Sequence, residues 1–227
     1  GESVGRLIAE EQIVVPDAGE LRRALAEAGA DPVAARRAAA AADLLAAMRE
    51  QHLSPGRHTI LHRWKAYSLQ AAAATAAVPF TSHPMFGHDI VYTHPLNDGA
   101  AVGRTAERDF LSFASTISRI ENGVYLSVGS AVMSPMIFEK SFAMAQNLAL
   151  QQGDRIRNHS IIVVDLADSE WDWSRGEPPA ESPAYYLRYC KTFSRMGGTM
   201  QYASADNRDF LLALLHRLDS CYFGFCD

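Results

Sequence analysis

The segment Ser160-Ile-Ile-Val-Val-Asp-Leu166 decides the fold class. Its apolar residues are consecutive rather than alternate, which is typical of a strand covered on both faces within a parallel sheet. Further short apolar runs bounded by Gly, Pro or Asp predict strands at 78–82, 123–128 and 198–204. Helical patterns alternate with these strands, at 106–120, 135–149, 183–192 and 208–218. The alternation predicts an α/β protein with an open, mostly parallel, Rossmann-like sheet and helices on both faces.

The chain before this region has a helical pattern. Asp17 followed by Glu20 has the form of a capping box and predicts a helix through residue 28. Asp31 and Pro32 supply an N-cap and a first-turn proline for a second helix, which runs to residue 51. A third helix is expected over 60–77. We therefore expect a single domain over 1–227, with a helical portion at 1–77 and an α/β core at 78–218.

Composition excludes several classes of protein. The net charge of −5, with basic residues scattered along the chain, argues against a nucleic-acid partner. No run of about 18 apolar residues occurs, so we expect no membrane span. Three cysteines (Cys190, Cys221 and Cys226) are too few and too irregularly spaced for a disulfide framework or a zinc cluster. They indicate free thiols in a cytoplasmic protein.

The first candidate site follows the strand at 123–128. Gly129 and Ser130 allow a tight turn and a close approach of the backbone to a ligand. Ser134 and Pro135 have the form of a cap and first turn for the next helix, whose free N–H groups favour an anion. In open α/β sheets, ligands bind at such carboxyl ends of strands. A tight turn without any ligand is the alternative.

The second candidate site is the loop 167–183, which follows the strand at 160–166. Irregular segments of about 15 residues or more are uncommon in compact domains and are usually functional when present. Asp165 stands at the entrance of this loop, whose acidic and aromatic residues include Asp168, Glu170, Asp172, Glu177, Trp171 and Trp173. Carboxylates beside aromatic rings favour a cationic, amine-bearing ligand. The alternative is a solvated acidic loop.

Lys191 is the candidate nucleophile. It follows Tyr189 and Cys190 directly, and desolvation among aromatic side chains favours the neutral, nucleophilic amine. The same spacing also suits an ordinary surface lysine.

Histidines are concentrated in one short segment. His83, His88 and His94, together with Asp89, are residue types that could form a metallohydrolase site. His83 and His94 each precede a proline, which favours loop conformations, so we expect polar loop histidines or ligand contacts rather than metal ligands.

The second half of the chain resembles the deoxyhypusine synthase family, which includes the homospermidine synthases. The resemblance rests on Gly123-Val-Tyr-Leu-Ser-Val-Gly-Ser-Ala-Val-Met133, followed by Phe138-Glu-Lys140 and Ala145-Gln-Asn147. It continues in order through four shorter segments: Val78-Pro-Phe80, Gly87-His-Asp-Ile90, Tyr189-Cys-Lys191 and Tyr202-Ala-Ser-Ala-Asp206.

The resemblance implies an NAD-dependent transferase that moves an aminobutyl-type group from a polyamine to an acceptor amine. Lys191 would hold the group as an imine. The residues implied to contact NAD are Gly129, Ser130, Asp165, Ala167, Ser174 and Asp206. The residues implied to contact the small-molecule amine are His88, Asp89, Glu170, Trp171, Asp172, Trp173 and Tyr189.

The chain departs from the family pattern at its N-terminus. Family members extend further at the N-terminus and take part of the NAD pocket from that segment. We therefore expect a homotetramer, or a partner chain that supplies the missing portion. Two other functions stay open: a metal-dependent hydrolase that uses His83, His88, Asp89 and His94, and a non-catalytic subunit that binds NAD or another ligand.

Overall fold

The computed structural model describes residues 1–222, without the side chains of residues 221 and 222. Two of the three cysteines, Cys221 and Cys226, therefore lie outside the described side chains. The chain divides into two compact units, Gly1–Ser112 and Phe113–Asp227, each of which is described by itself. The boundaries predicted from the sequence, 1–77 and 78–218 within one domain, do not coincide with this division.

Unit 1 contains two of the helices predicted from the sequence. α2 (Ala18–Ala26) begins after Asp17, whose carboxylate accepts a hydrogen bond from the Gly19 N–H. α3 (Pro32–Glu50) begins after Asp31, which accepts from two backbone N–H groups. Both caps are therefore confirmed. The two helices share an apolar cluster, which contains Val15, Leu21, Ala24, Ala41, Leu45 and Met48.

A small antiparallel sheet in unit 1 was not predicted. β1 (Gln12–Val15) pairs with β2 (Gly56–Thr59), and Gln12 lies opposite Thr59. The chain reaches β2 only after it has passed through α2 and α3, and β2 itself (Gly-Arg-His-Thr) has no apolar alternation. The sequence therefore shows no hairpin spacing between the two strands and no strand pattern at β2. α1 (Glu2–Glu10) precedes β1 and packs on α4 (Leu69–Thr75).

The helix predicted over 60–77 is wrong in its first half, where the structure has a short 3₁₀ helix, η1 (Lys65–Tyr67). Ser68 ends this turn in an extended conformation and caps α4 through its hydroxyl, so the helical path restarts there. The strand predicted at 78–82 is absent from the described chain. Ala77 has a positive φ of 54°, and the chain then continues irregularly to η2 (Ile90–Thr93) and α5 (Gly99–Ile117).

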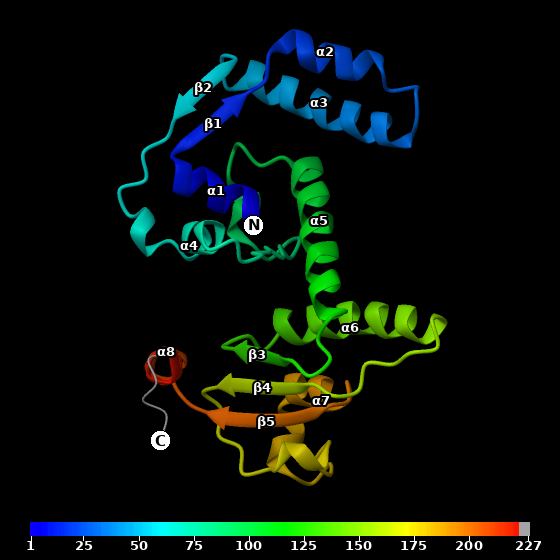
Figure 1. Cartoon of the computed structure of the whole chain (residues 1–227), viewed down its shortest axis with the longest axis vertical. Coiled ribbons are helices and arrows are strands. Elements are labelled where there is room, and N and C mark those ends of the chain that lie inside the picture. The colour runs from blue at the N-terminus through cyan, green and yellow to red at the C-terminus, as the bar shows by residue number, and fades with distance from the viewer. Residues whose placement is uncertain (223–227) are drawn as a thin grey trace. The chain divides into compact units, whose positions relative to one another are not determined.

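Unit 2 is built on a parallel sheet with the strand order β3-β4-β5 (Figure 1). β3 (Val124–Val128), β4 (Ser160–Asp165) and β5 (Thr199–Ser204) are the strands predicted at 123–128, 160–166 and 198–204. The remaining elements of this unit are α6 (Met133–Gln151), η3 (Trp173–Arg175), η4 (Pro183–Tyr186), α7 (Arg188–Ser194) and α8 (Asn207–Tyr222). The single helix expected over 183–192 is divided at Leu187 into η4 and α7.

The core of unit 2 lies on one face of this sheet. Ile161 and Val163 of β4 point to that face and are 0% and 1% exposed. They pack with Phe138 of α6 and Phe193 of α7, whose rings lie 5.8 Å apart, so both helices cover the same face. On the other face α8 contacts β4, while Val124 of the edge strand is 63% exposed. Val164 of β4, which points to this second face, is 1% exposed, so the central strand is covered on both faces as predicted, whereas the edge strand is not.

Within residues 1–222, no helix combines the length and the apolar character that crossing a bilayer requires.

Candidate functional site at the carboxyl edge of the sheet

The three parallel strands end at one edge, where Gly129 makes a tight turn after β3. Its N–H donates to the Val164 carbonyl at 3.0 Å, and its φ is 62°, a left-handed conformation that favours glycine. A Cβ at this position would lie 3.0 Å from Cγ of Asn207 and closer still to its Nδ2. The backbone of Gly129 and the side chain of Asn207 are therefore in direct contact at this edge.

The turn that follows Gly129 is fixed by serine hydroxyls. The Ser134 N–H donates to Oγ of Ser130 at 3.0 Å. Oγ of Ser134 in turn lies 2.7 Å from the Tyr125 hydroxyl and 2.8 Å from Oγ of Ser127. The expected cap at Ser134 is therefore wrong: α6 has already begun at Met133, and Ser130 binds its first turn.

Asn207 is the residue at this edge that sequence reasoning missed. Its side-chain oxygen is buried and has no hydrogen-bond partner within residues 1–222. A buried acceptor without a partner is costly, so such an atom indicates a position where a ligand donor would be stabilised. The sequence feature that could have indicated Asn207 is its position, one residue after Asp206 at the start of the helix that follows β5.

The aspartates expected to bind the cofactor have local partners. Asp206 accepts from the N–H groups of Arg208 and Asp209, at 2.9 and 3.3 Å, and so caps α8. Asp165 accepts from the N–H of Leu166 at 2.7 Å. Each carboxylate uses one oxygen in these bonds, which leaves the other for a ligand hydroxyl.

Two tyrosines connect α7 to the loop after β4. The Tyr202 hydroxyl donates to the Ala167 carbonyl at 2.6 Å and lies 3.5 Å from the Tyr189 hydroxyl. Burial raises the pKa of both phenols, and the bond to Tyr202 raises that of Tyr189 further. Burial and, secondarily, the charge of Asp165 raise the pKa of the Cys190 thiol to about 12. These groups are therefore protonated at neutral pH and act as fixed dipoles rather than as bases.

Lys191 lies against the ring of Tyr185, with Nζ 3.3 Å from the ring centroid. The lysine side chain is 14% exposed, and Nζ is 3.6 Å from Oε1 of Glu177. Arg195 holds the other oxygen of Glu177 more closely, at 2.9 Å through Nε and 2.6 Å through Nη2. Lys191 is thus the weaker partner of a carboxylate that is already neutralised, and it can leave this pair without stranding a charge.

The loop after β4 uses several predicted ligand residues for its own structure. Trp173 is 2% exposed and belongs to the core, so its expected place in a substrate channel is wrong. Trp171 donates to the Gly176 carbonyl at 2.9 Å, and Arg175 lies 5.5 Å from the centre of its ring. The hydroxyl of Ser174 donates to Asp172 at 2.6 Å, which lowers the pKa of that carboxyl. The exposed carboxylates of this loop are Asp172, Asp168, which accepts from Ser204, and two glutamates, Glu170 and Glu181.

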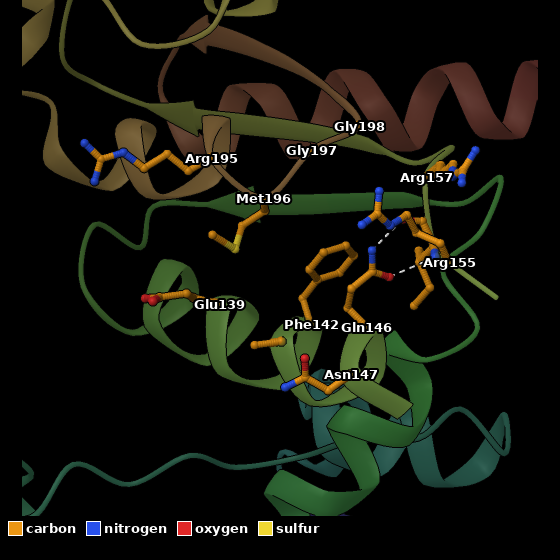
Figure 2. A pocket seen from close by; sticks show the side chains of 12 residues that line it. Glu139, Phe142, Gln146, Asn147, Arg155, Arg157, Arg195, Met196, Gly197 and Gly198 are labelled. Carbon is orange, nitrogen blue, oxygen red and sulfur yellow. Dashed lines mark hydrogen bonds between the residues drawn. The ribbon is translucent and has the colours of Figure 1, made fainter. Parts of the chain in front are cut away.

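A cavity in unit 2 was not predicted from the sequence. A cavity of about 640 Å³ lies beside α6 and the segments that lead into β4 and β5, and thus at the amino end of these two strands (Figure 2). Arg155, Arg157 and Arg195 contribute to its walls. Because sequence reasoning followed the rule that ligands bind at carboxyl ends of strands, it passed over this edge.

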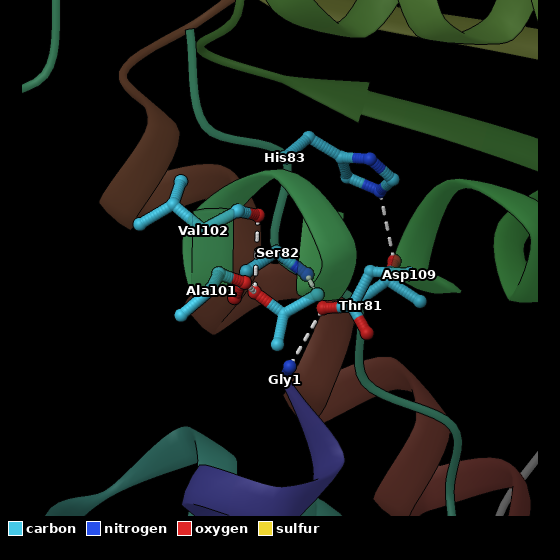
Figure 3. Close-up of polar contacts among 8 residues, drawn as sticks. Gly1, Thr81, Ser82, His83, Ala101, Val102 and Asp109 are labelled. Carbon is cyan, nitrogen blue, oxygen red and sulfur yellow. Dashed lines mark hydrogen bonds and ion pairs between the residues drawn. The ribbon is translucent and has the colours of Figure 1, made fainter. Parts of the chain in front are cut away.

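The histidines of unit 1 do not form a metal site. No group of three or more metal-ligating side chains occurs within residues 1–222. Figure 3 shows His83 beside Thr81, whose hydroxyl lies 2.9 Å from Nε2, with Asp109 nearby. Burial lowers the pKa of His83, although the charge of Asp109 opposes the shift. Asp89 accepts from the Met85 N–H, His94 accepts from the Leu96 N–H, and His88 is exposed.

No protein-family model, curated protein or solved structure matches this chain. A functional assignment therefore rests on the residues and on the geometry described above.

Proposed function

We propose that this chain is an NAD-dependent transferase of the deoxyhypusine/homospermidine synthase type, with the cofactor at the carboxyl edge of β3, β4 and β5. One observation carries the proposal. The left-handed Gly129 turn lies against Asn207, whose buried amide oxygen has no partner in the described chain. In a Rossmann-like sheet, which we propose for unit 2, this edge binds dinucleotides.

The residues of this edge have the chemistry that NAD requires. Asn207 would accept a hydrogen bond from an amide or amino group of the cofactor. Asp165, at the end of β4, would accept from a ribose hydroxyl, as acidic residues do in dinucleotide sites. Gly129 has no side chain, so the turn can hold Asn207 against the backbone at this edge. Ser130, Ala167, Ser174 and Asp206 complete the proposed cofactor set.

When bound, NAD would accept and return the hydride that interconverts an amine and an imine. Lys191 performs the covalent step. Its amine attacks the substrate imine carbon, a proton passes from this amine to the leaving diamine, and the C–N bond to that diamine breaks. The acceptor amine then attacks the lysine imine and displaces Lys191. Glu170, Asp168 and Tyr189 are the proposed contacts for the cationic substrate, together with Trp171 and Asp172, all of unit 2.

The test separates cofactor binding from the covalent step. Calorimetric titration with NAD should give one site per chain, and Asn207→Ala should weaken it by about tenfold, as expected when one hydrogen bond is lost. Arg208→Ala, at the exposed neighbouring position, is the matched control. An Asn207→Ala variant that binds NAD as tightly as the wild type would place the cofactor elsewhere.

The covalent step is tested by trapping. With NAD, spermidine and cyanoborohydride, peptide mass spectrometry should find an aminobutyl adduct on Lys191. Lys191→Arg should abolish the adduct and turnover while it leaves NAD affinity unchanged, because arginine keeps the charge but forms no imine. Lys140→Arg on α6, where the lysine side chain is 64% exposed, should behave as the wild type. NAD binding without any adduct would favour the non-catalytic subunit.

We further propose that the chain works as a homo-oligomer, a tetramer in the leading case, in the cytoplasm. The exposed leucines of α8 support the proposed homo-oligomer. Leu211, Leu212, Leu215 and Leu218 are 49–60% exposed and have the spacing of one helix face. The free thiol of Cys190 supports a reducing compartment. Light scattering of the wild type and of Leu212→Ser/Leu215→Ser tests the assembly, and a monomer in both would contradict it.

A further inference from the structure

The cavity at the amino end of β4 and β5 has a positively charged wall (Figure 2). Arg155 and Arg157 are exposed, and their guanidinium groups make no ion pair with any residue of the described chain. Arg195 contributes from the end of α7, where Glu177 neutralises it. The acidic residue on the wall, Glu139, pairs with Lys140. The surplus positive charge of the cavity therefore comes from Arg155 and Arg157.

The segment that carries these two arginines is held in place by hydrogen bonds to its backbone. Ile156, between them, donates its N–H to Gln146 at 2.8 Å and accepts from the same amide at 3.3 Å. The N–H of Arg157 donates to Glu121 at 2.7 Å. The two guanidinium groups thus project from a fixed backbone, which reduces the entropy lost when a ligand binds.

The rest of the lining combines the polar side chains of Gln146 and Asn147 with an apolar wall and two glycines. Phe142 and Ile156 are 6% and 8% exposed and form its inner wall together with Met196. Phe142 lies against His159, with ring centroids 5.0 Å apart, and burial lowers the pKa of this histidine. Gly197 and Gly198 close the opposite side in left-handed conformations, and a Cβ on Gly197 would meet nothing within 4 Å. Here a ligand can approach the backbone closely.

We propose that this cavity binds a small phosphomonoester whose phosphate contacts Arg155 and Arg157 and whose apolar group packs on Phe142 and Met196. Guanidinium groups bind phosphate through paired hydrogen bonds, and a dianion matches the two arginines that lack ion pairs. The volume of about 640 Å³ accommodates a molecule of metabolite size. The site lies at the opposite end of the strands from the proposed cofactor edge, so it stands independently of the proposed function.

Phenyl phosphate is the minimal probe for this cavity, with inorganic phosphate and phenol as its two halves. Calorimetry should show phenyl phosphate binding at least about tenfold more tightly than either half, with an affinity that falls as salt rises. Arg155→Gln/Arg157→Gln should weaken it by about tenfold or more, because each charge-assisted hydrogen bond contributes more than a neutral one. Arg36→Gln/Arg37→Gln on the exposed face of α3 removes the same charge and should have no effect.

A second readout locates the ligand. In protein labelled at the methionine methyl groups, phenyl phosphate should shift the Met196 signal, which Met196→Leu assigns. Equal affinity in the Arg155/Arg157 variant, or an unmoved Met196 signal, would overturn the site. Inorganic phosphate that binds as tightly as phenyl phosphate would overturn the apolar contact. Saturation with NAD should leave phenyl phosphate binding unchanged, and competition between them would overturn the independence of the two sites.

Discussion

A single methyl group added at Gly198 should lower the free energy of unfolding of unit 2. Gly198 has a φ of 68°, and a Cβ built there would lie 2.8 Å from Cδ2 and Nε2 of His159 and nearer still to the His159 carbonyl oxygen. That carbonyl accepts the Thr199 N–H at 2.9 Å, in the bond that starts the pairing of β4 with β5. Gly198→Ala therefore forces the backbone to move at the start of the central ladder.

Gly197→Ala is the matched control, because Gly197 also has a positive φ, 78°, but open space around its Cβ position. Both substitutions place a Cβ in a left-handed conformation, at a cost of about 1–2 kcal/mol. Both also restrict the unfolded chain equally. Gly198→Ala alone adds the clash, and overpacking of this kind costs about 1–3 kcal/mol. The difference in free energy of unfolding between the variants should therefore be about 2 kcal/mol.

Urea unfolding followed by tryptophan fluorescence measures this difference in the correct unit. Trp173 is 2% exposed in unit 2, whereas Trp64 of unit 1 is 74% exposed, so the change in signal on unfolding reports mainly on unit 2. With a slope of about 2 kcal/mol per molar urea, the midpoint of Gly198→Ala should lie about 1 M below that of Gly197→Ala. Equal midpoints for the two variants would refute the steric argument.

Two further predictions concern a cap and a buried histidine. Asp31→Ala should lower the stability of unit 1 by about 1 kcal/mol, because Asp31 accepts hydrogen bonds from the N–H groups of Val33 and Ala34 at the start of α3. Asp31→Asn is the control, and urea unfolding followed by circular dichroism is the measurement. His159 is 5% exposed, and neither of its ring nitrogens has a hydrogen-bond partner in the described chain. Burial lowers the pKa of this histidine from 6.5, so the unfolded state binds more protons than the folded state. The free energy of unfolding therefore falls as the pH drops below about 6.5. His159→Leu should remove that dependence between pH 7.5 and 5.5 without loss of stability at pH 7.5, and an unchanged pH profile would contradict the assignment.

The sequence was sufficient for the strands of unit 2 because their signal is local. Ser160–Asp165 is apolar at consecutive positions, and Gly129 and Gly198 mark the ends of neighbouring strands. The same reasoning failed at β1 and β2, because the pairing of Gln12 with Thr59 depends on the packing of the two intervening helices. It also failed for the strand expected at 78–82, where an apolar run was the sole criterion. Val78 is 56% exposed there, so a short apolar run does not by itself establish a buried strand.

The site residues show the same difference between local signals and long-range packing. The carboxyl-edge rule placed Gly129, Asp165 and Asp206 correctly with respect to the sheet, because it depends only on the order of strands and helices. It did not indicate that Trp173 fills the core, since burial is a property of the whole unit. Nor could it indicate the cavity with Arg155 and Arg157, whose fixed backbone depends on Gln146 and Glu121, distant in sequence.

Glu177 binds Lys191, in the middle of α7, and Arg195, which directly follows this helix. The hydrogen bond from Arg195 lowers the pKa of this carboxyl from 4.5. Its contribution to stability is therefore fully present above about pH 4.5 and is lost as the pH falls through the lower, folded-state pKa. Glu177→Gln should melt below the wild type at pH 7, and the gap should close under acid conditions, whereas Glu170→Gln should leave the melting temperature unchanged at both. A gap that persists in acid would show that Glu177 stabilises α7 by packing rather than by charge. A gap that closes would mean that, at neutral pH, the charged carboxylate of Glu177 holds both Lys191, the proposed nucleophile, and Arg195, which lies on the wall of the cavity at the amino end of β4 and β5.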